Sequence, residues 1–153
     1  MRFFSKCIYL ETKYSYEKVV NLIIENTDLN KNSMSFKKDK SKYFLGRKKG
    51  SELILEKNIN YSQSLNPIIK IKPLSETDNL KLEITFSVPI FVAILNSFII
   101  IFLITIAFLS FAEKNPNYYI LLVLVILFLT YNIITFQSLV KTNIKQLNKI
   151  LKN

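Results

Sequence analysis

The stretch of sequence at residues 80–95, LKLEITFSVPIFVAIL, changes its pattern at Pro89. Before the proline, apolar and polar residues alternate strictly, which is typical of a strand with one face on a core and the other in water. After it nearly every residue is apolar, and proline is well tolerated in the first turn of a helix. The stretch therefore predicts a strand over residues 80–88 that passes, without a linker, into a helix surrounded by a different solvent.

Charged residues are segregated along the chain of 153 residues, although half of the residues are hydrophobic and the formal net charge is +10. Residues 1–88 hold sixteen Lys or Arg and ten Asp or Glu, residues 89–136 hold one of each, and residues 137–153 hold four Lys and no acid. We therefore expect three parts: a charged domain at 1–88, an apolar pair of helices at 89–136 and a basic segment at 137–153.

The apolar part contains two runs that are long enough to cross a membrane. Residues 89–112 would form a helix of about 36 Å, against roughly 30 Å for a hydrocarbon core, and residues 118–136 are just sufficient. Between them EKNPN, residues 113–117, is polar and contains Pro116, so it reverses the chain. The rest of the chain is too small and too charged to cover two buried core helices. The pattern predicts a transmembrane helical hairpin.

The flanking charges predict the orientation of this hairpin. Four lysines follow the second run and three precede the first within residues 70–81, against Lys114 alone in the turn. An excess of positive charge marks the cytoplasmic side, and residues 2–10 are too short and too broken by Lys6 for the core of a signal peptide. We expect both termini in the cytoplasm of a bacterium, with the hairpin in its inner membrane.

Residues 1–88 read as a small α+β domain. Ser15 can cap a helix whose apolar residues repeat at helical spacing, with its end near residues 26–30 and a lysine-rich loop to residue 42. Gly50 is available for a positive φ in a hairpin turn. Strand-like runs lie at residues 3–10, 43–47, 52–56, 68–72 and 80–88. The order predicts a small antiparallel sheet that carries one N-terminal helix on its apolar face.

The C-terminal segment is amphipathic. Val140, Ile144, Leu147 and Leu151 recur at spacings of four, three and four, and no Gly or Pro separates them from the second run. One helix of about 51 Å can therefore span residues 118–151 and leave the bilayer by several turns. Its apolar stripe can pack on the sheet, lie in the membrane interface, or pair with a second copy. We favour packing on the sheet, because the sheet is tethered within reach.

Composition excludes several kinds of chemistry. The chain has one Cys, no His and two Gly, which excludes, within this chain, disulfides, zinc sites, Ser-His and Cys-His nucleophiles and glycine-rich phosphate loops. The carboxylates are scattered singly among lysines. We expect no catalytic residue, no cofactor and no metal, and an enzyme only if a partner supplies the reactive groups.

Two groups of polar residues are candidate contact sites. Two basic segments bring positive charge to loops of a domain held near an anionic leaflet, which makes them candidate contacts with lipid headgroups. Ordinary solvated loops, together with the positive-inside bias, are the preferred interpretation. Nucleic acid is not expected, because no recognition motif is present. The basic segments contain Lys37, Lys38, Lys40, Lys42, Arg47, Lys48 and Lys49.

Inside the apolar part, Asn96 and Asn132 are the side chains least suited to lipid. With the turn near residue 115, the antiparallel partner of Asn96 lies near residue 134, so Asn132 and Thr135 fall within one helical turn of it. We expect the two asparagines to face each other or a common protein partner. A locking pair is the preferred interpretation, because neutral amides form no proton relay.

The stretch YFLGRKKGSELILEKNINYSQSLNPIIKIKP, residues 43–73, resembles uncharacterised small bacterial membrane proteins. In these proteins a segment like F-x-G precedes a strand and a segment like N-S-F-x-P-x-I-x-G, followed by two membrane spans. The resemblance implies a cytoplasmic α+β domain followed by two transmembrane helices. It implies no activity.

These observations favour a non-enzymatic membrane protein that acts by binding, as an accessory or regulatory subunit of a larger membrane complex or as a homo-oligomer. The alternative is a membrane-anchored domain that binds a lipid or another apolar ligand. A cavity lined by core residues would favour the alternative, and a solid core would favour the subunit. The residues that decide this are Phe44, Leu53, Leu55, Ile69 and Ile84.

Overall fold

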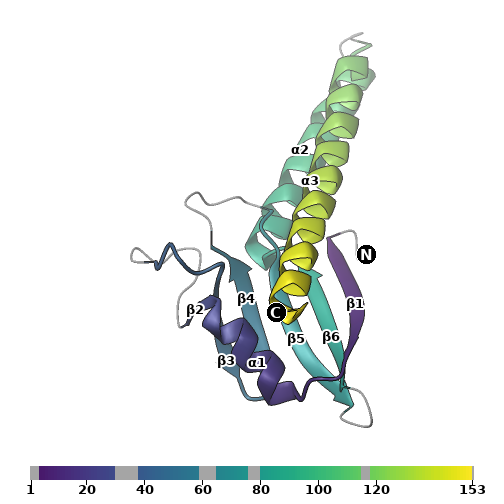
Figure 1. Ribbon diagram of the computed structural model, residues 1–153. Helices are drawn as coiled ribbons and strands as arrows, with labels where there is room; N and C mark the ends of the chain where they lie inside the picture. The colour runs from purple at the N-terminus through teal and green to yellow at the C-terminus, as the bar shows by residue number, and fades with distance from the viewer. Residues whose placement is uncertain (1–3, 30–37, 59–64, 76–79, 115–117, 153) are drawn as a thin grey trace.

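The computed structural model describes residues 4–29, 38–58, 65–75, 80–114 and 118–152 as an α+β chain with one sheet and three helices (Figure 1). The α+β class predicted from the sequence is confirmed. In chain order the elements are β1 (Ser5–Thr12), α1 (Tyr16–Glu25), β2 (Thr27–Leu29), β3 (Phe44–Lys49), β4 (Glu52–Lys57), β5 (Ile68–Ser75), β6 (Leu80–Ser87), α2 (Ile90–Ala112) and α3 (Tyr118–Lys152).

The sheet has six strands in the order β1-β6-β5-β4-β3-β2. It is mixed, and the prediction of a purely antiparallel sheet is wrong at β2, which pairs in parallel with β3 from Thr27 opposite Phe44. The reason lies at the end of α1, where the carbonyl of Asn26 accepts hydrogen bonds from the backbone N–H groups of Tyr43 and Phe44 at 2.9 and 3.0 Å. This contact places β2, which follows α1 directly, beside the start of β3, and the two strands run in the same direction.

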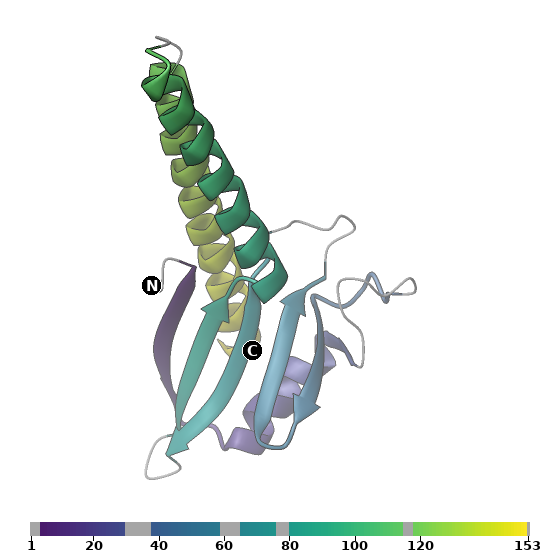
Figure 2. The same cartoon turned by 180° about the vertical axis from the view of Figure 1, so that it is seen from behind.

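One face of the sheet carries the hydrophobic core. Along β6 the even-numbered residues Leu80 to Phe86 are buried, and the residues between them are half-buried, as the alternation in the sequence predicted. The core is closed by Val19 and Ile23 of α1 and by Val140 and Leu147 of α3. Figure 2 shows the opposite face of the sheet, over which none of the described helices lies. We call this the far face.

Hydrogen bonds and a favourable charge at its two ends fix where α1 begins and ends. The side chain of Ser15 accepts a hydrogen bond from the N–H of Lys18 at 3.4 Å, and Glu17 lies in the first turn, where the helix dipole favours an acid. At the other end, the amide of Asn26 and the hydroxyl of Thr27 donate to carbonyls of the last turn. The ammonium of Lys42 donates to the carbonyl of Glu25 at 2.6 Å. The carbonyls at the end of α1 are therefore satisfied within the chain.

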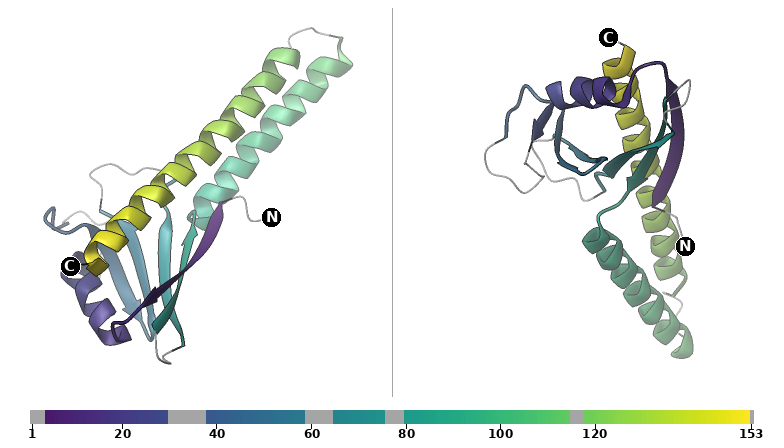
Figure 3. Two further views of the ribbon diagram at one scale, coloured as in Figure 1. Left: turned by 45° about the vertical axis from the view of Figure 1, so that its right-hand side comes forward. Right: turned by 90° about the horizontal axis from the view of Figure 1, so that it is seen from below.

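Helices α2 and α3 lie side by side and extend away from one end of the sheet (Figures 1 and 3). Both are long and apolar enough to cross a membrane by length and composition, and each contains an apolar window of 18 residues, with mean hydropathies of 2.8 in α2 and 2.4 in α3. Pro89 occupies the N-cap of α2, one position before the first turn. Most side chains of the apolar windows are exposed in the protein, which is opposite to what a buried core helix shows.

Helix α3 is continuous over 35 residues and belongs to both parts of the molecule. Its first half pairs with α2, and its second half lies over the sheet beside α1 (Figure 3). The ring of Phe136 meets the ring of Phe4 edge-on at 6.0 Å, which marks the end of the sheet. Beyond it Val140, Leu147 and Ile150 are buried, whereas Ile144 and Leu151 are half-buried, so the apolar stripe is rotated slightly from the predicted one.

Candidate functional site

The structure brings Asn96 and Asn132 together between α2 and α3. The Nδ2 atom of Asn96 donates to the Oδ1 atom of Asn132 at 3.2 Å, and the Nδ2 atom of Asn132 donates to the carbonyl of Phe128 at 2.7 Å. Their exposed fractions are 9% and 5%. The prediction that the two side chains face each other is confirmed. Thr135, three residues further along α3, is half-buried.

This pair can lock two helices but offers little chemistry. Both groups are neutral amides, so neither donates nor accepts a proton at ordinary pH. The hydrogen bond satisfies two polar atoms in a part of the protein where the surroundings are otherwise apolar. Its role beyond locking the helices stays a prediction.

The two basic segments lie at opposite ends of the sheet. Strand β3 begins opposite the end of β4, and β5 begins opposite the end of β6, so Phe44 lies at the end from which α2 leaves. Five residues later Lys49 lies about 17 Å away, at the far end. Lys38, Lys40 and Lys42 therefore lie on the α2 side, whereas Arg47 to Lys49 lie at the other end. Lys37 is outside the described residues, as are residues 59–64 of the stretch that carries the resemblance.

The segment on the α2 side is held by its own hydrogen bonds. The carboxylate of Asp39 accepts from the backbone and the hydroxyl of Ser41 at 2.9 and 2.7 Å, and these bonds hold the pKa of the Asp39 carboxyl below its ordinary value. The amide of Asn58 donates to the carbonyls of Asp39 and Lys42 at 2.7 and 2.9 Å. The ammonium of Lys42 caps the end of α1, since it donates to the carbonyl of Glu25. Among the described lysines of this segment, Lys40 is exposed, and Lys38 and Lys42 are half-buried.

The core residues that could have lined a cavity are fully covered. The exposed fraction is 0% for Phe44, Leu53, Leu55 and Ile69 and 1% for Ile84, and all five belong to one packed cluster. A solid core of this kind is what the subunit hypothesis expects.

A pocket of about 270 Å³ lies elsewhere, between α1, the start of β3 and the end of α3. Burial raises the pKa of the Tyr43 phenol in its wall, and a hydrogen bond with Gln146 opposes this shift. Sequence reasoning missed this pocket, because it depends on where the end of α3 lies relative to α1. It is lined by Leu22, Glu25, Asn26, Tyr43, Gln146, Lys149 and Ile150.

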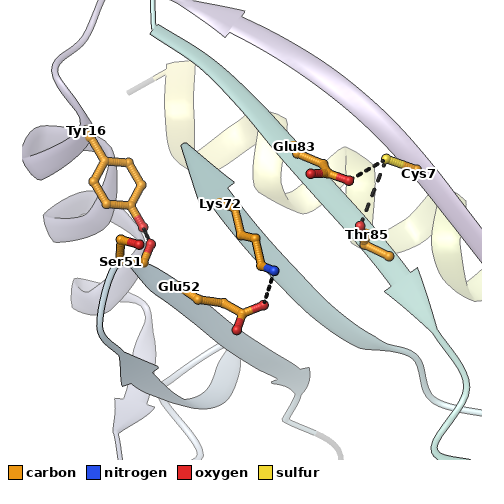
Figure 4. Close-up of polar contacts among 7 residues, drawn as sticks. All are labelled: Cys7, Tyr16, Ser51, Glu52, Lys72, Glu83 and Thr85. Atoms are coloured by element: carbon orange, nitrogen blue, oxygen red, sulfur yellow. Dashed lines mark hydrogen bonds and ion pairs between the residues drawn. The ribbon is translucent and has the colours of Figure 1, made fainter. Parts of the chain in front are cut away.

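The far face carries polar contacts between neighbouring strands (Figure 4). Lys72 forms an ion pair with Glu52 at 3.4 Å, and the thiol of Cys7 donates to the carboxylate of Glu83 at 3.5 Å. A hydrogen bond with Cys7 raises the pKa of Tyr9. Within the described part of the chain, no group of three or more Cys, Asp or Glu residues could hold a metal ion. The contacts are those of a solvated surface with cross-strand pairs.

Comparison of the chain with protein-family models, with curated proteins and with solved structures finds no match.

Proposed function

We propose that the chain is an integral protein of a bacterial inner membrane that acts by binding, as an accessory or regulatory subunit of a larger membrane complex. In this proposal α2 and the first half of α3 form a transmembrane hairpin over residues 89–136. Residues 1–88 and 137–153 form one cytoplasmic unit, with both termini on that side.

The single observation that carries the proposal is the continuity of α3. A helix of 35 residues joins the pair with α2 to the core of the sheet, with no Gly or Pro between the two halves. On the other side, β6 ends at Ser87 and α2 begins at Ile90. Two short, stiff connections would transmit a movement of the domain to the hairpin, whereas a flexible tether would not. A binding protein that regulates a membrane partner needs such a connection.

The solid core supports binding through surfaces over storage of a ligand. An apolar ligand site usually has a cavity of several hundred Å³ with apolar walls. The covered core offers none at the residues named above, and the pocket beside α3 is lined partly by charged and amide side chains. The lipid-binding alternative therefore has less support than the subunit.

Affinity purification of the tagged full-length chain in a mild uncharged detergent tests the proposal. We expect a membrane protein to be recovered in stoichiometric amount and identified by mass spectrometry. The matched control is an unrelated protein with two spans, carrying the same tag and expressed at the same level. Recovery of the chain alone, as a folded monomer or with substoichiometric proteins shared with the control, would contradict the subunit.

A further inference from the structure

Charge is distributed unequally between the two faces of the domain. The strand register puts five basic and five acidic side chains on the far face, so this face is balanced. The basic residues are Arg47, Lys49, Lys70, Lys72 and Lys81, and the acidic residues are Glu11, Asp28, Glu52, Glu56 and Glu83.

The helix side is not balanced. Lys141, Lys145, Lys149 and Lys152 are all exposed on α3, at spacings of four, four and three. They form what we call the α3 lysine stripe, on the side of α3 turned away from the buried Val140. Between residues 137 and 153 the sequence has no acid, and α1 adds Glu17 and Glu25 against Lys18. The helix side therefore has a clear positive excess.

Lipid headgroups cannot account for the whole stripe. Phe136 marks the end of the sheet next to the proposed membrane boundary, and along the helix axis Lys141 lies about 8 Å beyond it. Lys149 lies about 20 Å beyond it. Exposed charges are largely screened beyond about 8 Å at physiological salt. The end of the stripe is thus too far from the bilayer for useful attraction, so its charge is available to an acidic partner in the cytoplasm.

The α3 lysine stripe meets the pocket at one residue. Lys149 belongs to the stripe and also lines the pocket, whose apolar walls come from Leu22, Tyr43 and Ile150. The carbonyls at the end of α1, which would otherwise repel an acidic segment here, are already capped by Asn26 and Lys42. Glu25, Asn26 and Gln146 make the rest of the pocket wall polar. A bound chain can therefore seat one large apolar side chain against the apolar part of the wall, with its acidic side chains along the stripe and away from Glu25.

We infer that the α3 lysine stripe and the α1–α3 pocket form a docking surface for an acidic peptide segment of a partner protein, with one large apolar side chain seated in the pocket. The inference deepens the proposed function and rests on it, since it names the kind of segment by which the larger complex is held. The attraction between the lysines and the acidic side chains speeds the encounter and orients the segment on α3, and the pocket supplies the apolar contact.

The test uses the purified full-length chain in uncharged maltoside micelles and a random peptide library displayed on phage. Recovered peptides are synthesised with a fluorophore, and their binding is measured by anisotropy. We expect them to be net acidic with one large apolar residue, and to lose affinity when salt is raised or when that apolar residue is replaced by Ser. Failure to recover binders, or binders with no excess of Asp and Glu, would overturn the inference.

Two matched variants localise the binding. Lys145→Gln with Lys149→Gln removes two charges from the stripe, and Lys48→Gln with Lys49→Gln removes two from the exposed last residues of β3. All four side chains are exposed, so both variants should fold. We expect roughly fivefold weaker binding for the first variant and no change for the second. If the wild type and both variants bind the peptides equally well, or if both variants lose the same affinity, the stripe is not the site.

The two proposals can fail separately. If a stoichiometric membrane partner is recovered equally well with the Lys145→Gln and Lys149→Gln variant and the acidic peptides do not bind, the subunit stands and this docking surface is wrong. If acidic peptides bind the stripe but the chain has no stoichiometric membrane partner, the surface is real and the subunit assignment is wrong.

Discussion

Asn96 and Asn132 are joined across α2 and α3 by a hydrogen bond of 3.2 Å, from the Nδ2 atom of the first to the Oδ1 atom of the second. Each lies on the buried side of its helix, among side chains that are otherwise apolar. The pair therefore fixes how far one helix slides along the other, because a shift by one residue would leave both amides without this partner.

Replacing the two asparagines by Leu, singly and together, measures what the hydrogen bond contributes. We expect the summed losses of unfolding free energy in the two single variants to exceed the loss in the double variant. The difference, which is the coupling energy, should be about 0.6 and at most about 2 kcal/mol. Unfolding by SDS in mixed micelles, followed by circular dichroism, gives the values.

Strictly additive single effects would show that the Asn96–Asn132 hydrogen bond is worth nothing. A double variant that stays folded but no longer recovers the membrane partner would show that the amides form an interface with that partner.

The proposed orientation of the hairpin predicts which engineered cysteines react in intact cells. In a Cys7→Ser background, which removes the exposed native thiol, we expect Glu113→Cys to be labelled from outside by a membrane-impermeant maleimide. Ser41→Cys should react only after the cells are opened. Both side chains are exposed, so access across the membrane decides the result. Labelling of Ser41→Cys in intact cells would overturn the cytoplasmic assignment.

Helix geometry made the asparagine pair predictable, because a short turn and a fixed rise per residue determine which residues of two antiparallel helices share a depth. The burial of β6 followed in the same way from its alternation. Strand β2 could not be predicted, since three residues, TDL, carry no periodicity and its pairing depends on the contact of Asn26 with β3.

The two basic segments looked equivalent in the sequence, and only the strand register separates them. Strand β3 begins at the α2 end and carries Arg47 to Lys49 to the other end of the sheet. Headgroup contact therefore stays a prediction. In the proposed membrane orientation Lys38 and Lys40 lie at the end of the sheet nearer the membrane, and Lys48 and Lys49 lie at the other end. The pocket beside α3 could not be predicted from the sequence either, because it forms between segments more than 100 residues apart.

The glycine at position 46 is required by the close approach of neighbouring strands. A Cβ atom there would stand 2.6 Å from the carbonyl oxygen of Ile54 and 2.8 Å from Cδ2 of Leu55. Because a backbone carbonyl cannot move aside, Gly46→Ala should cost about 1–3 kcal/mol or prevent folding. Thermal unfolding by circular dichroism measures the loss.

Gly50 is the matched control for this effect. Its φ is +59°, but a Cβ atom there would meet nothing within 4 Å, so Gly50→Ala should cost only about 1–2 kcal/mol, through backbone strain. Gly50→Asn should cost less, since Asn adopts this conformation more readily. A Gly46→Ala protein as stable as the Gly50→Asn protein would contradict the crowding at β3.

Docking of α3 on the sheet should depend on Leu147, whose exposed fraction is 2%. Leu147→Ala is expected to cost about 2–5 kcal/mol, because it leaves a cavity in the core. The half-buried Ile144 gives the control, and Ile144→Ala should cost less. Hydrogen exchange should rise over residues 137–152 and stay low over residues 118–136. Equal protection in both variants would show that α3 is held mainly by its pairing with α2.

The phenol of Tyr16 ties the start of α1 to the β3–β4 turn, since it donates a hydrogen bond to the carbonyl of Ser51 (Figure 4). Burial is the larger cause that raises the pKa of Tyr16, and the nearby charge of Glu52 adds to it. A raised pKa means that folding favours the neutral phenol. The Tyr16 phenol therefore contributes fully to the stability of the fold below the ordinary tyrosine pKa of about 10. This contribution is lost as the pH rises through the higher pKa that Tyr16 has in the folded protein.

Tyr16→Phe should accordingly lower stability by about 0.5–1.5 kcal/mol at neutral pH, which is typical of one hydrogen bond. The difference from the wild type should shrink as the pH rises above about 10, because the phenol ionises first in the unfolded chain and only at higher pH in the folded protein, where it can then no longer donate. The remaining tyrosines are common to both proteins, so the difference between their unfolding curves isolates Tyr16. A difference that is constant from neutral pH to pH values well above 10, or absent throughout, would show that the phenol does not hold the turn.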